Sequence, residues 1–192
     1  MTALTPDFTP GPLAESGAVS VSLLAPTGRF SLRARATDMP VLSKAVGVDL
    51  PAKIGARANI GTVEILCLGP DEWHVLVAET DAPRLVERCA SVYADAPHSL
   101  TDISDREVSV RIEGPEAAEL LTLGCPRDLD RIAEGEGRRT LMDGATVVLW
   151  RDGKDSFRLD MWRSFAPHVV ALLETGCAEL AAEQSGLANR RP

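Results

Sequence analysis

Apolar and polar residues alternate over short runs along most of the chain, and such runs predict β-strands. Residues 19–24 and 30–36 show this alternation on either side of a turn that contains Pro26 and Gly28. Because both turn residues favour chain reversal, we expect the two runs to form a hairpin. Residues 39–46 then place their apolar side chains on one helical face, which predicts a helix.

A second pair of apolar runs spans residues 62–68 and 73–78. Residues 69–72 separate them with the sequence Gly-Pro-Asp-Glu, whose residue types suit a tight turn. The pattern therefore predicts a second hairpin. A helix is expected over 81–94, because an acid and Pro83 stand near its start, where a missing amide hydrogen costs nothing.

The second half of the chain repeats this order of elements. Residues 107–112 predict a strand, and Gly-Pro-Glu at the start of 114–123 opens a helix. Residues 146–151 and 156–162 form another predicted hairpin, and a last helix should run from Ser164 to about Gly176. Each half is therefore expected to be a β-α-β-β-α unit.

An offset of 84 positions superposes the two halves without a gap over residues 62–83. The identical pairs are Thr62 and Thr146, Val63 and Val147, Gly69 and Gly153, Asp71 and Asp155, Ala82 and Ala166, and Pro83 and Pro167. Most of them fall at a turn or a helix start, where a duplicated unit would keep them for backbone reasons. We interpret the halves as an internal repeat.

The predicted fold class is α+β, with two tandem β-α-β-β-α units, mainly antiparallel sheets and helices on one face of each sheet. The predicted divisions are an extended N-terminal arm over residues 1–17, a first half over 18–97, a second half over 98–180 and a frayed C-terminal tail over 181–192. The sequence leaves open whether the two sheets pair or stack.

Composition narrows the classes of partner. The chain has 192 residues, 45% of them hydrophobic, which is enough to fill a core and argues against disorder. Its net charge of −8 repels phosphate backbones and anionic membrane surfaces, so we expect neither nucleic acid nor membrane as partner. No signal sequence or membrane-spanning run is recognisable, and a cytoplasmic protein is expected.

Few residues suggest independent chemistry. The four cysteines, Cys67, Cys89, Cys125 and Cys177, are far apart and are expected to be buried thiols, with no metal site and no disulfide. The three histidines belong to no local motif, and no phosphate-binding loop or nucleophile elbow is present. Residues 102–106, Asp-Ile-Ser-Asp-Arg, are either a polar ligand site or a solvated turn. We expect no catalytic, cofactor-binding or metal-binding residue.

Several segments together resemble a known family. Asp-Ile-Ser at 102–104, Gly-Pro-Glu-Ala-Ala at 114–118 and Asp-Leu at 128–129 resemble motifs of the folate-binding superfamily that includes the glycine-cleavage T-protein. Leu-Gly-Pro-Asp-Glu-Trp at 68–73 and Arg-Ser-Phe-Ala at 163–166 are similar to segments of the gamma subunits of heterotetrameric sarcosine oxidases. The resemblance implies a T-protein-like folate-binding domain fold.

The resemblance also implies a role inside a complex. Such a gamma subunit is expected to be non-catalytic, to associate with alpha, beta and delta subunits, mainly alpha, and to support the folate-like domain of alpha. The complex would demethylate sarcosine oxidatively to glycine and pass the methyl carbon to tetrahydrofolate. Its FAD, FMN, NAD and tetrahydrofolate would be held by the other subunits, and this chain would hold no cofactor.

Interface candidates lie at two places in the sequence. Pro12 and Leu13 match the family near the N-terminus, and Trp162 stands between Met161 and Arg163 at a strand end, where a large amphipathic ring can anchor a partner. A rival hypothesis is a free-standing folate-binding one-carbon transferase, with Asp102 as the carboxylate that orients the pterin. A third keeps the complex but changes its substrate to another N-methylated amine.

Overall fold

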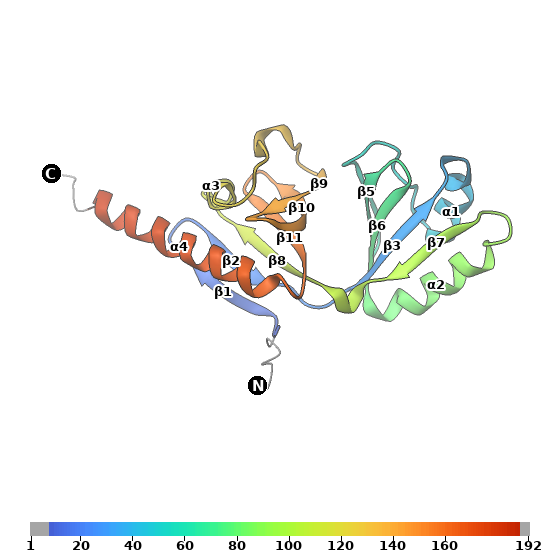
Figure 1. Cartoon of the computed structure of the whole chain (residues 1–192), viewed down its shortest axis with the longest axis horizontal. Helices are drawn as coiled ribbons and strands as arrows, with labels where there is room; N and C mark the ends of the chain where they lie inside the picture. The colour runs from blue at the N-terminus through green and yellow to red at the C-terminus, as the bar shows by residue number, and fades with distance from the viewer. Residues whose placement is uncertain (1–7, 189–192) are drawn as a thin grey trace. The chain divides into compact units, whose positions relative to one another are not determined.

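The structure is a computed structural model that describes residues 8–188, with side chains as far as Ser185 (Figure 1). Two compact units are formed. The six-stranded unit comprises the described residues up to Ala25, Glu107–Glu134 and the residues from Arg139 onward. The five-stranded unit comprises Pro26–Arg106 and Gly135–Arg138.

The six-stranded unit is one sheet with helices packed on its apolar face (Figure 1). Its elements are β1 (Gly11–Glu15), β2 (Ser20–Leu23), β8 (Glu107–Glu113), α3 (Ala117–Thr122), the 3-10 turn Leu129–Arg131, β9 (Gly137–Met142), β10 (Ala145–Gly153), β11 (Ser156–Trp162) and α4 (Ala166–Ala188). The first two residues of β9 group with the five-stranded unit. The strand order is β1-β2-β8-β11-β10-β9, and β8 pairs antiparallel with both β2 and β11.

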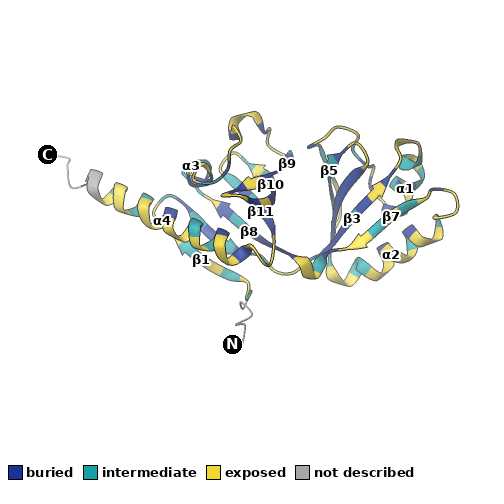
Figure 2. Ribbon diagram, in the orientation of Figure 1, coloured by how far each residue is buried: buried dark blue, intermediate teal, exposed yellow. Residues whose placement is uncertain are grey.

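Apolar residues alternate with polar ones along the strands of this sheet, and they recur with a helical period along the helices that pack on it. Val108, Val110 and Ile112 of β8 point into the core, where they meet the buried side chains of α3 and α4. Along α4 the buried positions are Ala166, Val169, Leu173, Gly176 and Cys177, which recur with the spacing of one helical face. Figure 2 shows the opposite side of α4 exposed.

The five-stranded unit follows the same plan. Its elements are β3 (Gly28–Ala34), the 3-10 turn Ala36–Asp38, α1 (Met39–Val46), β4 (Arg57–Ile60), β5 (Val63–Gly69), β6 (Glu72–Val77), the 3-10 turn Glu79–Asp81, α2 (Ala82–Ser91), β7 (His98–Asp102) and the 3-10 turn Ser104–Arg106. The strand order is β4-β5-β6-β3-β7. Leu42 of α1 and Leu85 of α2 pack on the sheet with Phe30, Trp73 and Val75.

Residues 135–138 join the five-stranded unit through polar contacts. Gly137 N donates to Gly55 O at 3.0 Å, and Lys53 Nζ lies 2.9 Å from Glu136 Oε1. The hydrogen bond from Lys53, together with the nearby Arg138 charge, lowers the pKa of Glu136 against the opposing effect of burial. The short segment is thus held by this unit although its neighbours in sequence belong to the other.

The predicted repeat is visible in the strand pairing. In β5 and β6, Cys67 pairs with Trp73 and Gly69 with Glu72, with a register shift between the pairs. In β10 and β11, Arg151 pairs with Phe157 and Gly153 with Ser156, with a shift at the same place. Each residue of the first hairpin corresponds to the residue 84 positions later in the second, so the two hairpins have the same register and the same bulge. The repeat predicted from the sequence is therefore also present in the structure.

One expectation about strand partners and one about the division of the chain differ from the structure. The runs at 19–24 and 30–36 do not form a hairpin, because β2 pairs with β1 and β8 whereas β3 pairs with β6 and β7. For the same reason the halves 18–97 and 98–180 differ from the observed units: residues 18–25 belong with β8, and β7 belongs with β3. Long-range pairing overrides proximity along the chain.

The two ends also differ from expectation. Within the predicted arm 1–17, residues 11–15 form β1 and pair with β2, while residues 1–7 lie outside the described part. Helix α4 does not end at Gly176 but continues to Ala188, into the predicted tail 181–192, whose last four residues also lie outside that part. Gly176 serves close packing, because a Cβ there would lie 2.5 Å from Leu120 Cδ1 of α3.

Candidate functional site

The corner between β11 and α4 holds three of the predicted interface residues. Along β11, Phe157, Leu159 and Met161 point into the core, which directs Trp162 to the surface at the strand end. Met161 is only 1% exposed, so it stabilises the core and has no surface to offer a partner. Of the predicted trio, Trp162 and Arg163 are exposed.

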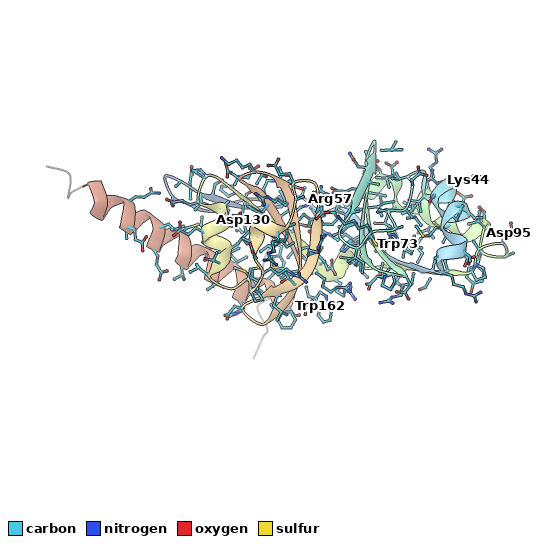
Figure 3. All side chains as sticks on the ribbon, turned by 90° about the horizontal axis from the view of Figure 1, so that it is seen from above. Lys44, Arg57, Trp73, Asp95, Asp130 and Trp162 are labelled. Atoms are coloured by element: carbon cyan, nitrogen blue, oxygen red, sulfur yellow. The ribbon has the colours of Figure 1, made fainter. Side chains whose placement is uncertain are left out.

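Trp162 stacks on a second exposed aromatic residue. Its ring centroid lies 6.0 Å from that of Phe165, with an angle of 29° between the planes. Trp162 is 43% and Phe165 40% exposed, and Figure 3 shows the labelled Trp162 ring at the periphery of the ribbon. Such large exposed rings are uncommon on a surface that contacts only water and are enriched at protein interfaces.

Arg163 extends the same corner. Its guanidinium carbon lies 4.8 Å from the centroid of the Phe8 ring, a cation–π geometry. Phe8 also packs against the edge of the core beneath. Sequence reasoning misses both Phe8 and Phe165, although Phe165 stands in the Arg-Ser-Phe-Ala segment and is the only large apolar residue between the strand and the helix.

The other predicted interface residues lie on β1, an edge strand of the sheet. Pro12 is exposed, as expected for a residue without an amide hydrogen on an edge strand. Leu13 is half-buried and packs against the core. Helix α4 contacts β1, so the N-terminal strand is anchored by its own unit.

Asp102 occupies the turn that follows β7. Its Oδ1 accepts hydrogen bonds from the Ser104 amide at 2.9 Å and the Ser104 hydroxyl at 2.6 Å. The Arg29 amide in turn donates to the Ser104 hydroxyl oxygen at 2.9 Å. This is the self-bonded turn that the Asp-x-Ser spacing allows, and it ties the end of β7 to β3. Oδ1 of Asp102 thus stabilises the turn, and a role of this exposed carboxylate in orienting a pterin stays a prediction.

A buried carboxylate that sequence reasoning misses lies on the sheet face opposite α3 and α4. Asp160 is 1% exposed; its Oδ2 accepts from Trp150 Nε1 at 2.6 Å and its Oδ1 from the Ser109 hydroxyl. The Arg158 guanidinium lies 4.4 Å above the Trp150 ring. The sequence does contain a signal for this network. Alternation along β11 places Arg158 and Asp160 on the same face of the sheet, and Trp150 of the paired strand lies beside them. We assign this Asp160 network a structural role.

The remaining polar and sulfur groups are dispersed. The four cysteines are free and buried. Burial raises the pKa of the Cys67, Cys89 and Cys177 thiols, which keeps them protonated and unreactive. Among residues with described side chains, no three of His, Cys, Asp and Glu gather as a metal site would require. None of the described helices is long and apolar enough to span a membrane.

Known proteins similar to this chain include sarcosine oxidase gamma subunits. The sarcosine oxidase subunit gamma of Corynebacterium sp. (strain U-96) is 33% identical, over 87% of this chain and 83% of that protein. A chain of the heterotetrameric sarcosine oxidase from Corynebacterium sp. U-96, solved in complex with pyrrole 2-carboxylate, superposes with a TM-score of 0.80 and 31% identity over 88% of this chain and 89% of that one. No family model matches.

A more distant solved structure shares the fold. The glycine cleavage system aminomethyltransferase T from Bartonella henselae superposes with a TM-score of 0.64 at 14% identity, over 82% of this chain and 46% of that protein. The predicted α+β class with antiparallel sheets and a T-protein-like fold is confirmed. The resemblance to sarcosine oxidase gamma subunits is confirmed as well.

Proposed function

This chain belongs to the family of sarcosine oxidase gamma subunits, and from that premise we propose that it is a non-catalytic subunit of a heterotetrameric sarcosine oxidase. The observation that carries the proposal is the match along almost the whole length of both chains in the solved complex, with a TM-score of 0.80. Its partners are alpha, beta and delta subunits, and its main contact is the folate-like domain of alpha.

The proposal places the chemistry in the other subunits. The complex converts sarcosine to glycine and passes the methyl carbon to tetrahydrofolate, with FAD, FMN, NAD and tetrahydrofolate bound outside this chain. Support comes from how this chain uses its own polar groups. The Asp102 carboxylate closes a local turn, and Asp160 accepts from Trp150 and Ser109, so each serves the fold of its own unit.

We place the complex in the cytoplasm. The four cysteines favour a reducing compartment, since all are buried single thiols and none is paired with another. Substrate choice belongs to the subunit that oxidises the amine, so another N-methylated amine would leave the role of this chain unchanged.

Coexpression tests the proposal. A tagged copy of this chain, produced with alpha, beta and delta subunits, should copurify with them in equal amounts, and the purified complex should oxidise sarcosine. The matched control is the complex without this chain, which should be less stable to heat or lost. A chain that purifies alone as a stable monomer and ignores the three subunits contradicts the proposal.

Calorimetry with tetrahydrofolate on the isolated chain distinguishes the non-catalytic subunit from the rival hypothesis of a free-standing one-carbon transferase. We expect no binding heat. Micromolar binding by the chain alone, lost in Asp102→Ala, would instead favour a folate-binding activity of its own.

A further inference from the structure

The aromatic corner, defined as Phe8, Trp162, Arg163 and Phe165, has the composition of an interface anchor. Tryptophan and arginine are the side chains most enriched among residues that dominate binding energy. Here a stacked Trp162 and Phe165 pair lies directly beside Arg163 in sequence, and both rings are about two-fifths exposed. The cost of leaving this much aromatic surface in water is recovered only when it is covered.

The corner is rigid before it binds anything. Met161 and Ala166, on its two sides in sequence, are 1% and 0% exposed, so both flanks are fixed in the core. The Phe165 amide donates to Trp162 O at 2.9 Å, and the Val169 amide donates to Phe165 O at 3.1 Å. Strand end, turn and helix start are therefore one hydrogen-bonded piece, and little conformational entropy is lost when its side chains are buried.

The positive charge of Arg163 indicates that the partner surface at this corner is negatively charged. Its guanidinium lies over Phe8, and among residues 8–185 no carboxylate lies within ion-pair distance of it. A guanidinium beside an aromatic ring can still donate two parallel hydrogen bonds to a carboxylate. The complement is an acidic side chain at the rim of an apolar depression.

We propose that the aromatic corner is the docking surface for the alpha subunit, the main partner in the proposed function, and that alpha presents a carboxylate to Arg163 beside an apolar depression that receives Trp162 and Phe165. The inference rests on the proposed function. A second copy of this chain is the poorer occupant, because each copy carries a net charge of −8 and two copies repel each other.

Two variants test the corner within the complete complex. Trp162→Ala with Phe165→Ala removes the rings, and Arg163→Glu reverses the charge without removing either ring. We expect each to weaken association of this chain with the other three subunits by at least roughly 30-fold, the level of an interface hot spot. The Arg163→Glu loss should also change with salt concentration, because it acts through charge.

Matched controls come from exposed residues of the five-stranded unit. Tyr93→Ala removes a 57% exposed ring, and Arg35→Glu makes the same charge change at another exposed arginine. Both controls should assemble as the unchanged chain does. Far-ultraviolet circular dichroism and the thermal midpoint of each purified chain should match those of the unchanged chain, which shows that the corner variants still fold.

The outcomes separate the two proposals. If the unchanged chain assembles and folded corner variants assemble equally well, the docking surface is wrong and the proposed function stands. If the unchanged chain itself fails to assemble, the proposed function fails. If the isolated chain forms a dimer that the corner variants abolish, a second copy is the occupant and the inference is overturned.

Discussion

Gly114 follows β8 at a point where the backbone of residue 18 passes very close. It has a φ of +130°, a conformation that side chains rarely adopt, and a Cβ there would lie 2.2 Å from Ala18 O. The obstacle is backbone, and it is fixed, because the Glu116 amide donates to the same Ala18 oxygen at 3.3 Å. Gly114→Ala should therefore destabilise the six-stranded unit.

Two costs add in this variant. Holding a non-glycine residue at such a φ costs about 1–3 kcal/mol. Forcing a methyl group into a filled space costs about 1–3 kcal/mol more, since the strand must shift. The sum, about 2–6 kcal/mol, is a large part of the roughly 5–15 kcal/mol by which a domain is stable. A fall in the thermal midpoint on the order of 10 °C follows.

Gly144→Ala isolates the backbone cost. Gly144 lies in the same unit with a φ of +82°, but nothing lies within 4 Å of its added Cβ, so only conformational strain of about 1–2 kcal/mol applies. Thermal unfolding followed by circular dichroism should rank the unchanged chain first, Gly144→Ala second and Gly114→Ala last. Equal losses in the two variants would show that the contact with Ala18 has no energetic weight, and the reasoning would be refuted.

Two further predictions concern buried groups. Asp160→Asn replaces an acceptor oxygen with an amide donor and should lower the free energy of unfolding by about 1–3 kcal/mol, measured by urea unfolding followed by tryptophan fluorescence. The control Asp155→Asn, at the exposed turn of the same hairpin, should leave this free energy almost unchanged. Equal urea midpoints for the two variants would count against the Asp160 network. Because burial raises the pKa of Cys67, Cys89 and Cys177, their unfolded thiols lose protons first and stability should fall as the pH rises above roughly 8.5. Replacing the three cysteines with alanine should make the thermal midpoint depend less on pH in this alkaline range. An unchanged slope would show that other groups cause the decline.

Local patterns predicted the elements that depend on neighbouring residues. The turns at 69–72 and 152–155 fix both repeated hairpins, since a short turn with glycine sets which residues pair. The partners of β2 could not be predicted, because the sheet joins it to β8 across more than 80 residues. Gly176 misled for a different reason: a glycine that permits two helices to approach looks in sequence like one that ends a helix.

The candidate surface was predicted in part. Trp162 was identified by its residue type and its place at a strand end, and the structure places it at the surface. Met161 was included as its neighbour, but the period of two along a strand sends adjacent residues to opposite faces. Phe8 could not be found, because it is far from Arg163 in sequence and meets it only through the fold.

Because β1 and β2 belong to the sheet that contains β8, they are synthesised well before the strand with which β2 pairs. The intervening residues 26–106 supply nearly all of the five-stranded unit, which can close while synthesis continues. At roughly 5–20 residues per second, the wait lasts on the order of ten seconds. During that interval the edge of β2 that later pairs with β8 is unsatisfied, and the segment of β1 and β2 is the one on which we expect a chaperone bound to the emerging polypeptide to act.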